Sequence, residues 1–247
     1  MALGLAFSQP AHRFARTVAL ERICSLFLNG DVPFDTPLSE RAIADAIGVG
    51  RMPVREALRD LAREGVVSVE PGRGTFLRKL GAPEIMELLE VRLALECMAA
   101  RLAAEKGFTG DLPQLVAELR ELQRLPFAGK RIRAAEAIGD RVHRAVVQGA
   151  SNETLNSLYA GLALRIGISL RLVQLRAHER IRQTVDEHLA VAEAILARRP
   201  DRAVKALQDH LRRGHDITMK SFSQPRPASG APNVTALARR RGRPPSE

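Results

Sequence analysis

Residues 51–77, RMPVREALRDLAREGVVSVEPGRGTFL, decide the fold of the first third of the chain. The β-branched run VVSV predicts a strand, and Pro71 followed by Gly72 fits a type II turn, in which the glycine takes a positive φ. Before it, an amphipathic helix that ends at Glu64 and Gly65 is predicted by four apolar residues at helical spacing: Val54, Ala57, Leu58 and Leu61. A helix followed directly by a small hairpin is therefore expected.

Two further helical patterns precede this helix. Apolar residues between Leu20 and Leu28 recur at helical spacing, and Ser39 is a good N-cap for a short helix that Gly48 would end. Three helices in this order are typical of a helix-turn-helix, whose last helix lies in the DNA major groove with its N-terminal residues at the base edges. The hairpin would follow as a wing, with the charged tip PGRG near the minor groove or the phosphates.

Arginines occupy every fourth position of the third helix, at 51, 55, 59 and 63. Arg51 and Arg55 project from nearly the same strip at its N-terminal end, and a planar guanidinium can bond guanine O6 and N7 together. Arginines are also good helix formers that pair with acidic residues such as Glu56 and Asp60. The spacing alone leaves both interpretations open, and the charged hairpin favours DNA binding.

The rest of the chain has a different pattern. From Pro83 to about Ser221 the periodicity is helical throughout, which predicts an all-α bundle of about six helices. We therefore expect a mainly α protein with a winged helix-turn-helix over residues 12–79, an all-helical domain over 80–222 and a disordered basic tail over 223–247. The tail contains RGRPP, which resembles an AT-hook for the minor groove of A/T-rich DNA, although an ordinary basic tail has the same composition.

The composition limits the classes of partner. A formal net charge of +10 favours a polyanion such as nucleic acid. Only two cysteines occur, far apart, so neither a disulfide framework nor a cysteine-rich zinc site is indicated. We find neither a secretory signal nor an apolar run of about 18 residues, and we expect a soluble, cytoplasmic protein with no membrane partner.

Three histidines fall on separate predicted helices, each beside apolar residues: His143, His188 and His210. Neutral imidazoles that converge from different helices suit a zinc or nickel ion. Unrelated, partly exposed histidines would produce the same pattern. The residues alone therefore leave a metal site and scattered histidines as alternatives.

The segment SERAIADAIGVGRMPVREALRDLAREGVVSVEPGRGTFL resembles the winged helix-turn-helix of GntR-type bacterial transcription regulators. The resemblance covers about residues 16–78. Gly50 stands where the family usually has a serine or threonine cap, Met52 where threonine is common, and Arg59 and Arg63 have no base-reading role in the family. The residues expected at the DNA are Arg41, Arg51, Met52, Arg55, Gly72 and Arg73.

Three later segments resemble the FCD domain of the FadR subfamily: EVRLALECMAARLAAEK, DRVHRAVVQGASNETL and VDEHLAVAEAILARRPDRAVKALQDHL. The resemblance implies a divalent metal, zinc or nickel, held by His143, His188 and His210 together with an aspartate four residues before the first histidine. That aspartate position is Gly139 in this chain. Asp140, one residue later, is the candidate substitute ligand.

The same resemblance implies an effector site and a dimer. A small carboxylate binds at the metal or in the pocket beside it, and Arg92 corresponds to a pocket-facing arginine, with Arg165 as a second candidate. A bidentate guanidinium is a suitable carboxylate receptor. A salt bridge from Arg92 to Glu96, one helical turn on, is the alternative. FCD domains usually dimerise, which would pair two winged modules on a palindromic operator.

These patterns support one leading hypothesis and two alternatives. The leading one is a ligand-responsive, dimeric transcription regulator, a repressor that releases its operator when a small carboxylate binds. A metal-dependent hydrolase built on the three histidines is the first alternative, but no general base accompanies the histidines and the winged module would be unexplained. The second is an effector-independent architectural DNA-binding protein that uses the basic tail.

Overall fold

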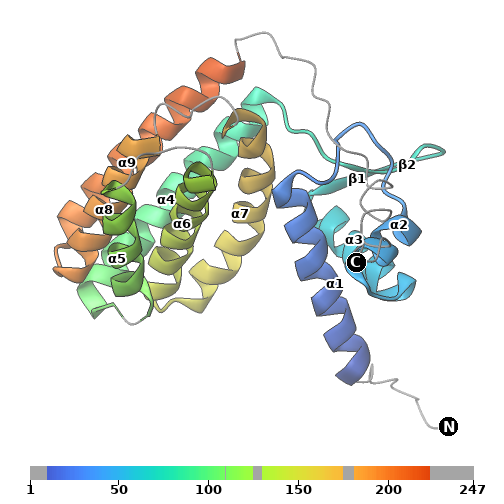
Figure 1. Cartoon of the computed structure of the whole chain (residues 1–247), viewed down its shortest axis with the longest axis horizontal. Coiled ribbons are helices and arrows are strands. Elements are labelled where there is room, and N and C mark those ends of the chain that lie inside the picture. Colours follow the sequence, from blue (N-terminus) through green and yellow to red (C-terminus); the bar gives the residue numbers. More distant parts are fainter. Residues whose placement is uncertain (1–9, 109, 125–129, 175–180, 223–247) are drawn as a thin grey trace, which may run out of the picture. The chain divides into compact units, whose positions relative to one another are not determined.

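The computed structural model describes residues 10–108, 110–124, 130–174 and 181–222, and these form two compact units that divide between Leu80 and Gly81 (Figure 1). The described residues are mainly helical, with one two-stranded sheet, so the expected fold class is confirmed. The expected basic tail, with its RGRPP motif, lies outside the described residues. No helix in the described part of the chain is both long enough and apolar enough to cross a membrane.

The N-terminal unit contains three helices and a hairpin. Its elements are α1 (Pro10–Asn29), α2 (Glu40–Ile47), α3 (Arg51–Arg63), β1 (Val67–Glu70) and β2 (Gly74–Leu77). Helices α1 and α2 both pack on α3, and a small core forms between these elements. Its largest fully buried side chains are Ile23, Phe27, Ile43, Leu61 and Leu77.

The local signals in the sequence explain where α2 begins and ends. The Ser39 side chain accepts a hydrogen bond from the backbone N–H of Ala42, as a helix N-cap does. Gly48 ends the helix with a φ of +67°, a conformation that glycine adopts without a steric penalty. The short turn from Gly48 to Gly50 then leads into α3, so the predicted helix-turn-helix is present.

The hairpin behind α3 is antiparallel, with Val67 opposite Leu77 and Glu70 opposite Gly74. Gly72 has a φ of +73°, and the backbone N–H of Arg73 donates to the carbonyl of Glu70 at 3.0 Å. These features match the predicted turn with a glycine at its third position. The wing therefore places Arg73 at its tip.

The C-terminal unit is entirely helical among its described residues. Its elements are α4 (Ala82–Lys106), α5 (Leu112–Gln123), α6 (Lys130–Gly149), α7 (Glu153–Gln174), α8 (Ile181–Leu196) and α9 (Pro200–Phe222). The long helix α4 packs along α9, α6 and α7, and α8 contacts both α9 and α5 (Figure 1). The middle of α4 therefore lies inside the bundle, where Glu96 is fully buried beside Ala99 and Ala100.

Candidate functional site

The recognition helix α3 presents its first arginine to solvent. Arg51 is exposed at the first helical residue and makes no hydrogen bond or ion pair within the described part of the chain. Gly50 precedes it as the N-cap and supplies no side-chain cap. Met52, next along, is 54% exposed although its side chain is apolar. The N-terminal end of α3 is thus exposed and positively charged, and no other described side chain is hydrogen-bonded to Arg51.

Arg55 is held by a residue that the sequence pattern did not point to. Its Nε lies 2.9 and 3.0 Å from the two carboxylate oxygens of Glu40 on α2, and its Nη2 lies 2.9 Å from Oε2. This hydrogen-bonded pairing lowers the pKa of Glu40. One edge of the guanidinium is therefore occupied, and Nη1 is left for another acceptor. Arg41, the neighbour of Glu40, is exposed, with its Nε 4.0 Å from Asp45.

Arg63, the last arginine of α3, differs from Arg51. Arg63 pairs with Asp60 one turn earlier, and Asp60 also pairs with Arg16 of α1. Asp60 therefore anchors α1 to α3 while it neutralises part of the basic strip. For Arg63, pairing with an acidic residue on the same helix, one of the two predicted alternatives, is present.

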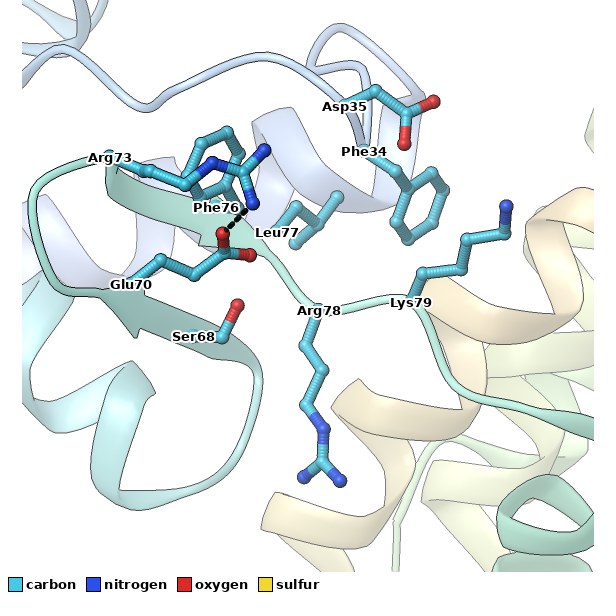
Figure 2. A pocket seen from close by; sticks show the side chains of 9 residues that line it. All are labelled: Phe34, Asp35, Ser68, Glu70, Arg73, Phe76, Leu77, Arg78 and Lys79. Atoms are coloured by element: carbon cyan, nitrogen blue, oxygen red, sulfur yellow. Dashed lines mark hydrogen bonds and ion pairs between the residues drawn. The ribbon is translucent and has the colours of Figure 1, made fainter.

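A cleft of about 390 Å³ lies beside the wing. It is lined by Phe34, Asp35, Ser68, Glu70, Arg73, Phe76, Leu77, Arg78 and Lys79. Figure 2 shows the Arg73 side chain directed at Glu70, with which it forms an ion pair, and its guanidinium carbon lies 5.6 Å from the centroid of the Phe76 ring. The ion pair engages only one terminal nitrogen of Arg73, and the side chain is 74% exposed.

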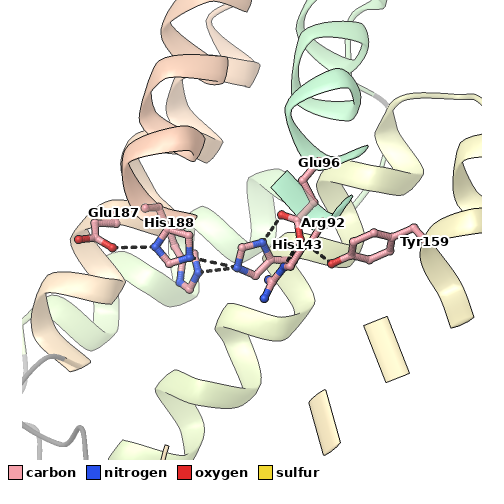
Figure 3. A network of polar contacts seen from close by, with 7 residues as sticks. Arg92, Glu96, His143, Tyr159, Glu187 and His188 are labelled. Carbon is pink, nitrogen blue, oxygen red and sulfur yellow. Dashed lines mark hydrogen bonds and ion pairs between the residues drawn. The ribbon is translucent and has the colours of Figure 1, made fainter. Parts of the chain in front are cut away.

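The helical unit brings the three predicted histidines together. His143 of α6, His188 of α8 and His210 of α9 are all buried, with exposed fractions of 6%, 3% and 8%. The Nε2 atom of His143 lies 3.1 Å from that of His188 and 3.2 Å from that of His210 (Figure 3). One potential ligand atom from each ring lies within 4.8 Å of the other two. Scattered, unrelated histidines are thereby excluded.

Glutamate carboxylates contact the Nδ1 edge of two of these imidazole rings. Nδ1 of His143 lies 2.5 Å from Oε2 of Glu96, and Nδ1 of His210 lies 2.7 Å from Oε2 of Glu187. Burial lowers the pKa of His143, and lowers that of His210 to about 4, so both rings are neutral at pH 7. Each neutral ring then carries its proton on Nδ1, and their Nε2 lone pairs face each other.

This donor set fits a divalent metal ion. Two acceptor nitrogens 3.2 Å apart cannot hydrogen-bond to each other, and a cation held by both would remove their repulsion. Imidazole suits zinc and nickel, and a carboxylate behind the ring is the usual outer partner of a metal-bound histidine. The structure supports a metal site of this kind without identifying the ion.

Asp140 does not join this donor group. One residue further along α6 turns its side chain by about 100° away from the position of Gly139. The Asp140 carboxyl interacts electrostatically with Arg92 instead, and burial raises its pKa. A Cβ atom at Gly139 would lie only 2.6 Å from Cε1 of His188, so the imidazole lies directly against the glycine. The proposed substitution by Asp140 is therefore not seen in the arrangement of the side chains.

Glu96 links the histidines to Arg92. Its Oε1 lies 2.5 Å from Nε of Arg92 and accepts a hydrogen bond of 2.7 Å from the hydroxyl of Tyr159 (Figure 3). Burial would raise the pKa of Glu96, but the charge of Arg92 and the hydrogen bonds from His143 and Arg92 lower it far below its usual value. The salt bridge from Arg92 to Glu96, one of the two alternatives for this arginine, is thus present.

Arg92 nevertheless retains binding capacity. Only its Nε contacts Glu96, and its two terminal nitrogens have no partner among the described residues. Arg165, the second arginine expected at the effector, has a buried Nε that finds no acceptor there either. The central role of Glu96 could not be predicted from the sequence, because its partners His143 and Tyr159 come from distant helices.

Comparisons with known proteins identify both units. The family model described as "Bacterial regulatory proteins, gntR family" matches residues 17–77, and the model of the FCD domain matches residues 87–213, just over half of the chain. A "Probable D-xylose utilization operon transcriptional repressor" of Paenarthrobacter nicotinovorans is 29% identical over 203 residues, which are 81% of this chain and 88% of the relative. The transcriptional regulator LutR of Bacillus subtilis is 28% identical, over 79% of this chain and 97% of its own.

A solved structure supports the same fold. Escherichia coli McbR/YncC superposes with a TM-score of 0.69 at 21% identity, over 84% of this chain and 98% of the other. The matching families are regulators and not enzymes, so the hydrolase alternative has no support, and the FCD match speaks against a protein without an effector domain. The chain belongs to the GntR family of bacterial regulatory proteins, as an FCD-type, DNA-binding transcription regulator.

Proposed function

We propose that this regulator binds a palindromic operator as a homodimer and represses transcription until a small carboxylate binds its helical domain. Residues 12–79 bind DNA, and residues 80–222 hold the effector and the partner subunit. The convergence of three buried imidazoles, joined to the charged Arg92 through Glu96, is the observation that carries the proposal. The name of the Paenarthrobacter relative, a repressor, favours repression over activation.

The DNA contacts come from α2, α3 and the wing. Arg51 has no competing partner among the described residues, so it can bond a guanine in the major groove without first breaking an ion pair. Arg55 approaches with its orientation fixed by Glu40. Arg73 reaches the minor groove or a phosphate from the tip of the wing, with its second terminal nitrogen not engaged by Glu70. The full set of proposed contacts is Arg41, Arg51, Met52, Arg55, Gly72 and Arg73.

A divalent metal, zinc or nickel, would be held by His143, His188 and His210. When bound, it supplies a positive centre that attracts an anionic ligand. The two outer carboxylates keep the rings of His143 and His210 in the orientation that this role requires. Three protein ligands would leave room in the coordination of such an ion for a further ligand.

Arg92 is the second receptor for the effector. The guanidinium edge that Glu96 leaves unbound can accept a carboxylate with two parallel hydrogen bonds. Arg165, with its buried and unpaired Nε, is the further candidate. Binding at Arg92 would draw it away from Glu96, and through Glu96 would change the position of His143. This continuous set of contacts is the proposed origin of the conformational response.

The test begins with selection of binding sequences from a randomised DNA pool by the purified protein. We expect two equivalent half-sites related by a two-fold axis. Operator affinity is then measured by fluorescence anisotropy with a panel of small mono- and dicarboxylates, in the presence of zinc. At least one carboxylate should weaken binding about 5-fold or more. An operator affinity that no carboxylate changes would contradict the proposal.

A further inference from the structure

Met52 is an exposed apolar residue at the start of the recognition helix. It is the second residue of α3, and its exposed fraction is 54%. At about 100° per residue, its side chain points almost directly away from the buried face of the helix, which consists of Val54, Ala57, Leu58 and Leu61. Met52 therefore lies on the side of α3 opposite the core of the N-terminal unit.

The neighbours of Met52 offer few hydrogen bonds to a base. Gly50 has no side chain, and Pro53 has neither a polar side chain nor a backbone N–H. Arg51 supplies the strong hydrogen-bond donors among residues 50–53. The first turn of α3 thus presents one long cationic side chain and, directly beside it in the sequence, one long apolar side chain.

The major groove of DNA offers an apolar side chain a specific partner. Base edges there carry hydrogen-bond donors and acceptors, and thymine adds an apolar group, its C5-methyl. The thioether of methionine is only a weak acceptor, so its burial against a polar base edge would leave that edge without a partner. Burial against a methyl group removes apolar surface of both groups from water, and the unbranched side chain adapts its shape to the contact.

We propose that Met52 reads a thymine in each half-site of the operator through its C5-methyl group, beside the guanine that Arg51 bonds. The inference rests on the proposed function, which puts the N-terminal end of α3 in the major groove. Consecutive Cα atoms are about 3.8 Å apart and consecutive base pairs about 3.4 Å apart, so the two side chains start about one base-pair step from each other. Arg51 then selects one base by hydrogen bonds, and Met52 selects its neighbour by apolar contact.

The test removes the methyl group from the DNA and leaves the protein unchanged. Each thymine of the selected operator is replaced in turn by uracil, at the symmetry-related positions of both half-sites, and affinity is measured by fluorescence anisotropy. Uracil also pairs with adenine and lacks only the C5-methyl. At one thymine position we expect affinity to fall about 4-fold for each half-site, the effect of losing one buried methyl-sized group. A scan in which no uracil weakens binding would overturn the inference.

Variants at position 52 show whether Met52 is the side chain that detects the methyl group. Met52→Ala and the polar variant Met52→Gln should bind the thymine and uracil operators equally, whereas Met52→Leu, which stays apolar, should keep the preference for thymine. Met98→Ala is the matched control, because Met98 is similarly exposed, at 52%, but belongs to α4 of the helical unit. It should behave as the wild-type chain does. A thymine preference that survives in Met52→Ala would assign the methyl group to another residue and overturn the inference.

The inference and the proposed function fail in different ways. The response of operator binding to carboxylates is measured on the same wild-type samples. If a carboxylate weakens operator binding but no thymine preference depends on Met52, the inference fails and the regulatory proposal stands. If the Met52-dependent preference is found but no carboxylate alters operator affinity, the inference stands and the regulatory proposal fails.

Discussion

Glu96 and His143 are joined inside the helical domain, with Oε2 of the fully buried carboxylate 2.5 Å from Nδ1 of the imidazole. The other oxygen of Glu96 contacts Nε of Arg92 at 2.5 Å. One side chain of α4 therefore connects a proposed metal ligand to a proposed effector receptor. A ligand that changes either end must change the hydrogen bonding of the other, which is a physical route for coupling between them.

Glu96→Gln tests this connection. The amide keeps the shape but removes the charge, which leaves Arg92 buried without its counterion and weakens the acceptor for His143. Breaking a buried pair in this way typically costs about 3 to 5 kcal/mol, so the unfolding free energy in urea should fall by a similar amount. Zinc affinity, measured by chelator competition, should fall about 10- to 100-fold.

Glu187→Gln is the matched control for that variant. Glu187 supports His210 in the same manner, but its second oxygen binds Arg213, which is half-exposed. We expect a similar loss of zinc affinity with a smaller loss of stability, because Arg213 can be solvated. Equal destabilisation by the two variants would show that the Arg92–Glu96 pair has no special energetic weight.

Metal removal should lower the thermal stability of the protein. An ion that binds only the folded state stabilises that state by about 2.7 kcal/mol when the free ion concentration is 100 times the dissociation constant. Added zinc should therefore raise the melting temperature of the chelator-treated wild-type chain. His188→Gln, which removes one of the three donors, should respond much less. A melting temperature of the wild-type chain that is indifferent to zinc would argue against a metal at this site.

Arg51 and Arg63 should have different roles although they lie on one helix. Arg51→Ala should cost about 1 to 3 kcal/mol in affinity for the selected operator and relax the preference at one base pair. Arg63→Ala should leave that affinity nearly unchanged, because Arg63 is engaged with Asp60 at the far end of α3. Anisotropy titrations at several salt concentrations separate a lost base contact from a lost phosphate contact. Equal losses in the two variants would restore the view of one uniform basic face.

Glu40→Gln tests whether Arg55 is positioned by its partner. The loss of negative charge should raise affinity for random DNA, while the freed guanidinium should discriminate less between bases. The ratio of operator affinity to random-DNA affinity should therefore fall. The pKa of Glu40 is lowered in the folded state, so the pair persists above the ordinary glutamate pKa and is lost only as the pH falls through the lowered value. The ratio in the wild-type protein should accordingly stay constant between about pH 6 and 8.

The sequence predicted those features that depend on neighbours along the chain. The buried face of α3, the cap at Ser39 and the positive φ of Gly72 follow from residues only a few positions apart. The histidine cluster was accessible through helical spacing together with the resemblance to FCD domains. The partnership of Glu96 with His143 was not, because 47 positions separate the two residues and only the packing of α4 against α6 brings them together.

Two further residues, Asp140 and Glu40, lie where the sequence pattern did not predict them. Asp140 is three residues from His143 and was the candidate fourth ligand, yet its side chain does not join the three histidines. No role was predicted for Glu40, although it pairs with Arg55 across the turn between α2 and α3. For Asp140, the rotation of about 100° per helical residue decides where the side chain lies. For Glu40, the packing of α2 against α3 decides which side chain it meets.

Gly50 offers a test of the one place where α3 lacks a standard helix signal. Its φ of −62° is open to any residue, and a Cβ atom there would make only ordinary contact with Pro53 at 3.7 Å. A serine hydroxyl could accept a hydrogen bond from the N–H of Met52, since Pro53 has none to donate. Gly50→Ser should stabilise the winged domain by a few tenths of a kcal/mol, whereas Gly50→Ala should be less stable than Gly50→Ser by about 1 kcal/mol. Urea unfolding compares the three proteins, and equal stability of the serine and alanine variants would show that solvent already satisfies the first turn of α3.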